Sequence, residues 1–215
     1  MTRKPPFIID AGPALNFLSK GHQNLLINAV RRQTINAPQS VEAEVLRNAR
    51  KTRKFKGAEG RWKNMKPHWL TVLSDDATDL NLLNAAQILL NVPLEERLDE
   101  GDDLGETMVV LHAYVRARQG TVVYVIIDDA GGRTFANKAI ANLARHKAAG
   151  RPVGSMYIVR TPDLIERRLN SDDIPDIATL EAIWADIAPL DDGLEDDLSM
   201  TGLLTSPEWN RPRKK

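Results

Sequence analysis

The first 160 residues alternate short apolar blocks with longer segments of helical period. The clearest block is Val122–Ile127, a continuous, mostly β-branched run that predicts a strand buried on both faces. Four further strands are predicted, at Phe7–Asp10, Thr34–Ala37, Trp69–Leu73 and Ser155–Val159. Helices are predicted after Pro13, over residues 22–31, from a Ser40 N-cap, over residues 79–90, over Leu104–Arg118 and over Gly131–Ala149. This alternation predicts an α/β domain with a mostly parallel sheet over residues 1–160.

The pattern changes after residue 160. Helices are predicted at Pro162–Leu169 and Thr179–Ile187, followed by a solvated acidic loop at Asp191–Asp197 and a mobile end in PEWNRPRKK. We therefore expect two parts: a domain over residues 1–160, and an acidic, partly helical C-terminal extension over residues 161–215.

Composition excludes several classes of protein. The chain has 215 residues and is 42% hydrophobic, but no apolar run approaches the roughly 20 residues of a membrane span. The start, MTRKPPFIID, lacks the apolar stretch of a signal peptide, so we expect a cytoplasmic protein without membrane contact. Since there is no cysteine, disulfides, zinc–thiolate sites and thiol catalysis are excluded. No Walker A, GxGxxG or GxSxG sequence occurs.

Acidic residues stand next to predicted strands or helix starts in four places. They are Asp10, Glu42 with Glu44, Asp102 with Asp103 and Glu106, and Asp128 with Asp129. Carboxylates that follow parallel strands meet at one rim of the sheet, where ligands bind in open α/β folds. Because such carboxylates repel one another, the pattern predicts a hard cation such as Mg²⁺ or Mn²⁺ among them. Metal-dependent phosphate chemistry is the expected function of such a site.

Each cluster also has an ordinary structural interpretation, and the sequence leaves both open. Asp10, and one of Asp128 and Asp129, would cap the helix that follows. The spacing Asp103-x-x-Glu106 is close to a capping box. On the helix after Ser40, Glu44 is expected to reach inward, whereas Glu42 is expected to face solvent.

Charge is distributed unevenly although the net charge is zero. Residues 45–66 carry nine Lys and Arg against Glu59 alone, and residues 161–200 carry twelve Asp and Glu against two Arg. The basic stretch, with Phe55, Trp62 and Trp69 interleaved, suits a nucleic-acid backbone with base stacking. The candidate RNA-binding residues are Arg47, Arg50, Lys51, Arg53, Lys54, Lys56, Arg61, Lys63 and, further on, Arg133.

Four segments together resemble the PIN-domain nucleases, most closely the VapC-type toxins of toxin–antitoxin pairs. The segments are FIIDAGPALNFL, APQSVEAEVLR, DDLGETMVVLHAYVRARQG and VVYVIIDDAGGRTFANKAIA. They occur in the family's order over about residues 6–160. The resemblance implies a three-layer α/β/α sandwich with a five-stranded parallel sheet. It also implies Mg²⁺- or Mn²⁺-dependent RNA cleavage, a cognate antitoxin as partner and a homodimer by analogy.

The resemblance also assigns roles to the acidic residues. Asp10 matches the first family acid and Glu44 the helix acid. Glu106, with Asp103 beside it, matches the third, and Asp128 or Asp129 the fourth. Gly12 stands where many family members carry Ser or Thr, so a hydroxyl ligand is not expected there.

The sequence therefore predicts a metal-dependent endoribonuclease, the toxin of a toxin–antitoxin pair. Its expected catalytic residues are Asp10, Glu44, Asp103, Glu106, Asp128 and Asp129, with Asp10, Glu106, Asp128 and Asp129 as metal ligands. One alternative is a binding module of the same fold that holds RNA without cutting it. Another is a phosphatase that uses the same carboxylates.

Overall fold

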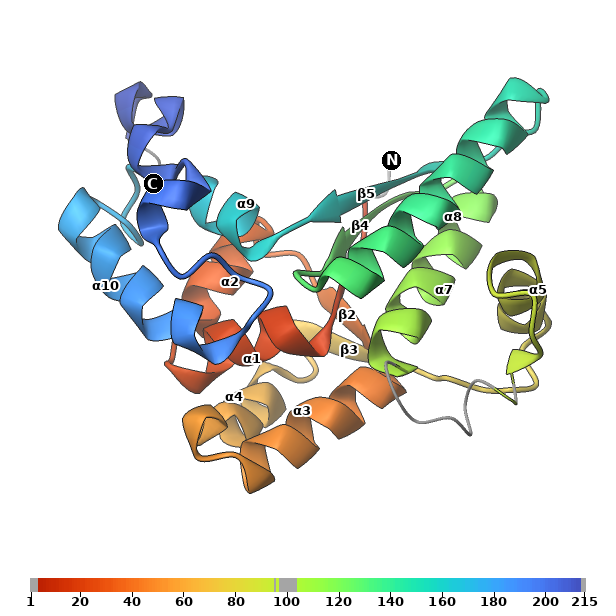
Figure 1. Ribbon diagram of the computed structural model, residues 1–215, viewed down its shortest axis with the longest axis horizontal. Coiled ribbons are helices and arrows are strands. Elements are labelled where there is room, and N and C mark those ends of the chain that lie inside the picture. The colour runs from red at the N-terminus through yellow and green to blue at the C-terminus, as the bar shows by residue number, and fades with distance from the viewer. Residues whose placement is uncertain (1–3, 95, 97–103, 214–215) are drawn as a thin grey trace.

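A single parallel sheet organises the structure. The computed structural model describes residues 4–94, 96 and 104–213. Its sheet has the strand order β3-β2-β1-β4-β5, and every neighbouring pair is parallel (Figure 1). The strands are β1 (Phe7–Ile9), β2 (Ile35–Pro38), β3 (Leu70–Leu73), β4 (Val122–Ile126) and β5 (Ser155–Val159). All five predicted strands are thereby confirmed to within a residue or two, and the sheet is wholly rather than mostly parallel.

Helices connect the strands and cover the sheet. They are α1 (Ala11–Ser19), α2 (Gln23–Ala29), α3 (Gln39–Lys51), α4 (Ala58–Met65), α5 (Leu80–Leu89), α7 (Leu104–Arg118), α8 (Ala130–Ala148), α9 (Thr161–Glu166) and α10 (Ile177–Ile187). The described residues also form the 3-10 helices η1 (Arg53–Phe55), η2 (Ala188–Leu190), η3 (Leu198–Thr201), η4 (Leu203–Thr205) and η5 (Pro207–Asn210). This α/β architecture is consistent with a three-layer sandwich. Within the described ranges, no helix has the length and apolar character needed to cross a membrane.

Helix α7 is the central helix of the core. Met108, Val109, Val110 and Leu111 are all fully buried, so apolar residues occupy every side of this turn. The helix packs against β1, β2, β4 and β5 and is itself flanked by α3, α5 and α8. Because it is enclosed along its length, the position of its first turn beside the sheet is fixed.

The start of α3 differs from the prediction. Helix α3 begins at Gln39 directly after Pro38, and no side chain caps it. Ser40 is therefore not the N-cap. Its backbone N–H instead donates to Asp75 Oδ2 at 2.6 Å, from the loop that follows β3. The orphan donor of the first turn is thus satisfied by a distant residue rather than a local one.

The C-terminal region packs onto the same core. Leu180, Trp184, Ile187 and Leu190 are buried together with residues of the sheet domain. Helix α9 packs against α2, and η2 packs against α1 (Figure 1). At the end of the chain, where mobility was expected, residues 207–210 form η5, and Asn170 Nδ2 donates to the Arg211 carbonyl at 2.7 Å.

Candidate functional site

The carboxyl ends of β1 and β4 place two aspartates side by side. Ile9 pairs with Ile126 in the sheet, and the Asp10 N–H donates to the Ile126 carbonyl at 3.0 Å. Asp10 follows β1 directly, and Asp128 comes just after the end of β4. From β1 the chain builds the sheet first toward β2 and β3, and later toward β4 and β5 on the other side. The aspartates therefore lie at a topological switch point, where parallel α/β sheets bind ligands.

Asp10 is a buried carboxylate with one unpartnered oxygen, although a hydrogen bond to the Ala11 backbone opposes the rise of its pKa. Its side chain is 5% exposed, and Oδ1 has no hydrogen-bond partner among the described residues. Asp10 occupies the N-cap position of α1, as the structural interpretation expected, but its side chain makes no cap bond to that helix. Burial raises its pKa well above the ordinary value, and the carboxylates of Glu106, Glu44 and Asp128 raise it further. A positive group placed here would reverse this shift.

Glu44 reaches the same rim from α3. A Cβ atom at Gly105 would lie 2.9 Å from Glu44 Oε2 and 3.6 Å from Asp10 Oδ1. The two carboxylates therefore converge over the first turn of α7. Glycine at position 105 leaves the space that they occupy, because any side chain there would displace the Glu44 carboxylate. Glu42 faces the other way and accepts from Trp62 Nε1 at 2.9 Å.

Glu106 approaches the start of α8. A Cβ at Gly132 would lie 2.8 Å from Glu106 Oε2, and one at Gly131 would lie 3.8 Å from it. Asp129 Oδ2 lies 2.9 Å from the same point at Gly131. Glu106 and Asp129 are thus close neighbours across these two glycines. Asp102 and Asp103, the other members of the third predicted cluster, lie outside the described residues.

Asp128 and Asp129 have different surroundings. Asp128 is fully buried, and its two oxygens accept from the Thr161 N–H, at 2.8 Å, and from the Thr161 hydroxyl. Burial raises its pKa to about 6, with a further contribution from Asp191, while the Thr161 bonds oppose the shift. Asp129 is exposed and caps α8 by accepting from the Gly132 N–H at 3.0 Å. The capping interpretation therefore holds for Asp129, and Asp128 anchors the start of α9.

A cavity of about 430 Å³ opens at this rim. The sheet domain lines it with Gly12, Leu15, Asn16, Glu44, Asn48, Lys54, Phe55, Asp129, Ala130 and Arg133, and the C-terminal region with residues 190–193. Within the lining, Asn16 Nδ2 donates to Asp191 Oδ2 at 2.8 Å. Asp191 Oδ2 also lies 2.9 Å from the place of a Cβ at Gly12, so this carboxylate fills the space beside the glycine.

Asp191 was missed as a site residue by sequence reasoning. It was expected in a solvated acidic loop, and its neighbours Asp192, Glu195, Asp196 and Asp197 are indeed exposed. Asp191 itself is half-buried and folds into the cavity. No local pattern separates it from the other acids of this loop, because its partner Asn16 lies 175 positions earlier.

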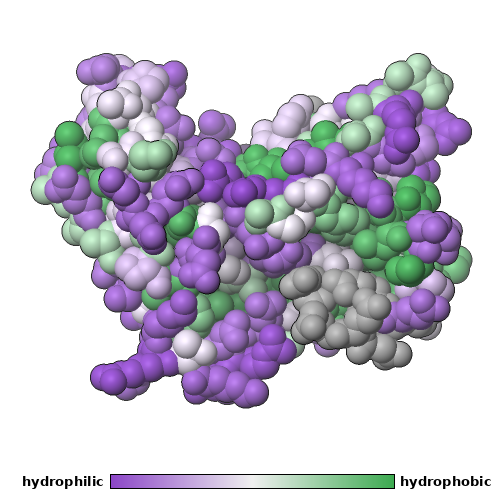
Figure 2. Space-filling view, viewed as in Figure 1, coloured by the Kyte–Doolittle hydropathy of each residue, from purple (hydrophilic) through white to green (hydrophobic). Residues whose placement is uncertain are grey.

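Many of the predicted RNA-binding cations are engaged inside the protein. Arg50 and Lys63 pair with Glu59, at 2.7 and 2.6 Å. Arg61 donates to the Leu18 carbonyl, Lys54 to the Leu190 carbonyl and Arg133 to the Asp128 carbonyl, at 2.9, 2.8 and 2.7 Å. Of the predicted RNA-binding cations, Arg47, Lys51, Arg53 and Lys56 are exposed and have no ion pair or side-chain hydrogen bond among the described residues. The surface over α3, η1 and α4 is accordingly hydrophilic (lower left in Figure 2).

The predicted stacking aromatics are mostly core residues. Phe55 and Trp62 are 9% and 1% exposed, so the stacking prediction is wrong for both. Their period along η1 and α4 places them against the core while the charged residues between them face water. Trp69 is half-buried, and the Arg32 guanidinium lies 5.9 Å from its ring centroid.

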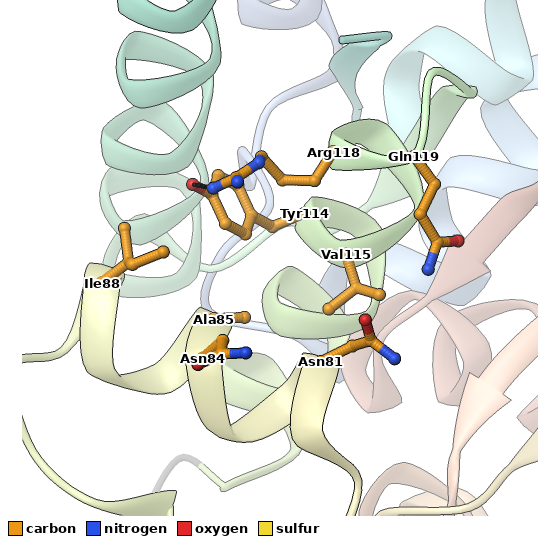
Figure 3. Close-up of a pocket in the computed structure, with 8 residues that line it drawn as sticks. All are labelled: Asn81, Asn84, Ala85, Ile88, Tyr114, Val115, Arg118 and Gln119. Atoms are coloured by element: carbon orange, nitrogen blue, oxygen red, sulfur yellow. Dashed lines mark hydrogen bonds between the residues drawn. The ribbon is translucent and has the colours of Figure 1, made fainter.

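A second cleft, of about 340 Å³, lies between α5 and α7 (Figure 3). Asn81, Asn84 and Ile88 line it from α5, and Tyr114 and Arg118 from α7. Arg118 donates to the Tyr114 hydroxyl at 3.2 Å. Among the described residues, the lining contains one guanidinium and no carboxylate, and it lies at the opposite end of α7 from Glu106. Its chemistry does not match that of the acidic rim.

The rim residues suit a hard cation by their chemistry. Across the described ranges, no three His, Asp or Glu side chains are placed closely enough to enclose an ion. Mg²⁺ is usually held by one or two carboxylates and keeps several waters, so it does not require such a group. The unpartnered Asp10 Oδ1, with Glu44 beside it, matches that requirement. These two residues fit the metal implied by the resemblance.

No protein-family model, curated protein or solved structure matches this chain. The fold and the residues of the rim are therefore the basis on which a function is proposed.

Proposed function

We propose that the protein is a Mg²⁺- or Mn²⁺-dependent endoribonuclease, acting as the toxin of a toxin–antitoxin pair. The observation that carries the proposal is Asp10, a buried carboxylate with an unpartnered oxygen and three further carboxylates around it. In a protein that only bound RNA, this concentration of negative charge would repel the phosphates and lower the affinity for RNA. The toxin role and the PIN-type fold rest on the sequence resemblance.

In this proposal Asp10 and Glu44 would hold the metal ion, with Glu106 on α7 and Asp129 at the start of α8 close to them. A bound divalent ion would activate water at neutral pH and polarise the phosphodiester. Asp128 orders the rim, because its bonds to Thr161 fix the end of β4. The resemblance implies products with a 5′-phosphate and a 3′-hydroxyl.

The surrounding cations guide the RNA to the rim. Lys54 and Arg133 line the cavity, and each is held in place by a backbone carbonyl. Arg47, Lys51, Arg53 and Lys56 extend a positive surface away from it. Phosphates attracted to this surface would be delivered against the negative field of the carboxylates.

The test is incubation of the purified protein with a mixed RNA pool in Mg²⁺, in Mn²⁺ and in EDTA, beside Asp10→Asn. We expect metal-dependent fragments with 5′-phosphates, reduced more than about 100-fold in the variant because the buried carboxylate is removed. Equal cleavage by wild type and Asp10→Asn would refute the proposal. RNA binding that is salt-sensitive and indifferent to EDTA, without cleavage of any RNA tested, would support the binding module instead.

A further inference from the structure

Asn16 carries a second unsatisfied oxygen at the cavity. Its side chain is fully buried in α1, and Oδ1 has no hydrogen-bond partner among the described residues. The amide orientation is fixed by chemistry, because an ionised Asp191 can only accept and Nδ2 must therefore face it. Oδ1 is left as a buried acceptor with nothing to accept from, which is unfavourable unless a ligand supplies the missing partner.

Asp191 is held beside Asn16 by the segment that carries it. The Gly193 N–H donates to Asp191 Oδ1 at 2.8 Å. On either side, Lys54 Nζ donates to the Leu190 carbonyl at 2.8 Å and the Arg160 guanidinium Nη2 donates to the Gly193 carbonyl at 3.3 Å. The carboxylate is thus positioned both by its own loop and by bonds from that loop to the sheet domain.

The cavity favours a cation at this point. Its lining has four carboxylates, those of Glu44, Asp129, Asp191 and Asp192, against the two cations Lys54 and Arg133. Amide and carboxylate oxygens are ligands of Mg²⁺ and Mn²⁺. A Mg²⁺ ion lies about 2.0–2.1 Å from its ligands, closer than the roughly 2.7–2.8 Å of a hydroxyl hydrogen bond. A bound ion therefore needs less space beside this oxygen than a hydrogen-bonded hydroxyl or water does.

We infer that Asn16 Oδ1 and the Asp191 carboxylate are ligands of a second divalent-cation site, distinct from the pair Asp10 and Glu44. The choice of Mg²⁺ or Mn²⁺ rests on the proposed nuclease function, whereas the site itself rests on the two residues. The C-terminal region then supplies a metal ligand to a cavity that the sheet domain alone leaves open. Cation binding and docking of residues 190–193 are coupled, because the same carboxylate takes part in both.

The experiment is a titration of the metal-free, full-length protein with Mn²⁺ alone, which gives the number of ions bound and their affinities. Asp191→Asn is compared with Asp196→Asn, which removes the same charge from an exposed position of the same loop outside the cavity. The amide introduced by Asp191→Asn keeps an oxygen that can accept from Asn16, so the fold is expected to remain. Thermal unfolding in EDTA checks this for each variant.

We expect two Mn²⁺ per wild-type chain, with one weakened at least about tenfold by Asp191→Asn and unchanged in Asp196→Asn. Asp10→Asn should weaken the other ion. Binding of a single ion by the wild type, or equal binding by Asp191→Asn and Asp196→Asn, would overturn the second site. Failure of the second site and failure of the proposed function give different results. Binding of two ions without RNA cleavage would refute the nuclease alone. RNA cleavage with one bound ion would refute the second site alone.

Discussion

The acidic rim and the basic stretch at residues 45–66 are both dense in charge, but the protein uses them differently. At the rim, Asp10 Oδ1 is buried and unpartnered, and burial together with the carboxylates of Glu106, Glu44 and Asp128 raises the pKa of Asp10. In the basic stretch, Glu59 alone accepts from Arg50 and Lys63, and its pKa falls to about 2 through these bonds. At the rim, a buried oxygen of Asp10 lacks a hydrogen-bond partner among the described residues, whereas in the basic stretch Arg50 and Lys63 form ion pairs at the surface.

This difference distinguishes a candidate site from a charged surface. Exposed ion pairs contribute little to stability, and each group in them already has a partner and does not need a ligand. Buried carboxylates without partners are unfavourable, so they indicate a bound group that the fold is arranged to receive. A buried polar oxygen without a hydrogen-bond partner, rather than a high density of charge, identifies the rim as the place where chemistry is expected.

The largest expected effect is on the rate of RNA cleavage, and it should distinguish two glutamates of α3. Glu44→Gln should lower the RNA cleavage rate more than about 100-fold, since it removes a charge beside Asp10. Glu42→Gln, two residues earlier, should leave cleavage nearly unchanged, because Glu42 bonds Trp62 and Lys66 away from the rim. Initial rates on one RNA substrate measure both. Similar losses in the two variants would mean that the rim is not the catalytic site.

The second effect concerns stability and pH without metal. Folded Asp128 has a pKa of about 6, against roughly 3.9 in unfolded chains, so the folded state binds the extra proton between these values. Its contribution to the free energy of unfolding is therefore present at about pH 4 and disappears as the pH rises through about 6, by about 3 kcal/mol. Urea unfolding in EDTA from about pH 4.5 to about 7 measures this. Asp128→Asn should flatten the decline, and a decline of equal slope in that variant would assign it to another group.

The smallest expected effect is that of the exposed cations on RNA affinity. RNA binding is measured in the Asp10→Asn background so that no substrate is cut. Replacing Lys51 and Arg53 with alanine should reduce the slope of log affinity against log salt by about 0.7 for each phosphate that is no longer neutralised. Replacing Arg50 and Lys63 should change it less, because both side chains are paired with Glu59. Equal changes in the two double variants would show that the internal ion pairs do not limit RNA binding.

Particular residues show which parts of the fold and of the candidate site could be predicted from the sequence. The run Val122–Ile127 identified β4 because a continuous, mostly β-branched apolar run of this length is typical of a strand in a parallel sheet, and its residues are buried or half-buried. Asp10 and Asp128 were placed at one rim because both follow strands of a parallel sheet, and pairing of β1 with β4 then brings them together. Ser40 failed as an N-cap because Asp75, from a distant loop, satisfies its N–H. Phe55 and Trp62 were wrongly expected at the surface because the charged residues around them suggested an exposed segment, whereas their helical spacing places them against the core.

The sequence by itself determined the order of strands and helices along the chain, and with it that Asp10 and Asp128 both follow strands. This order is a consequence of local period, whereas the two aspartates lie side by side because β1 pairs with β4. Only the tertiary structure decided that Asp191 enters the cavity, that Asn16 is left with a buried free acceptor, and that Arg61 and Lys54 bind carbonyls. Each depends on which surfaces pack together across the fold, and that information is spread over the whole chain rather than contained in any one segment.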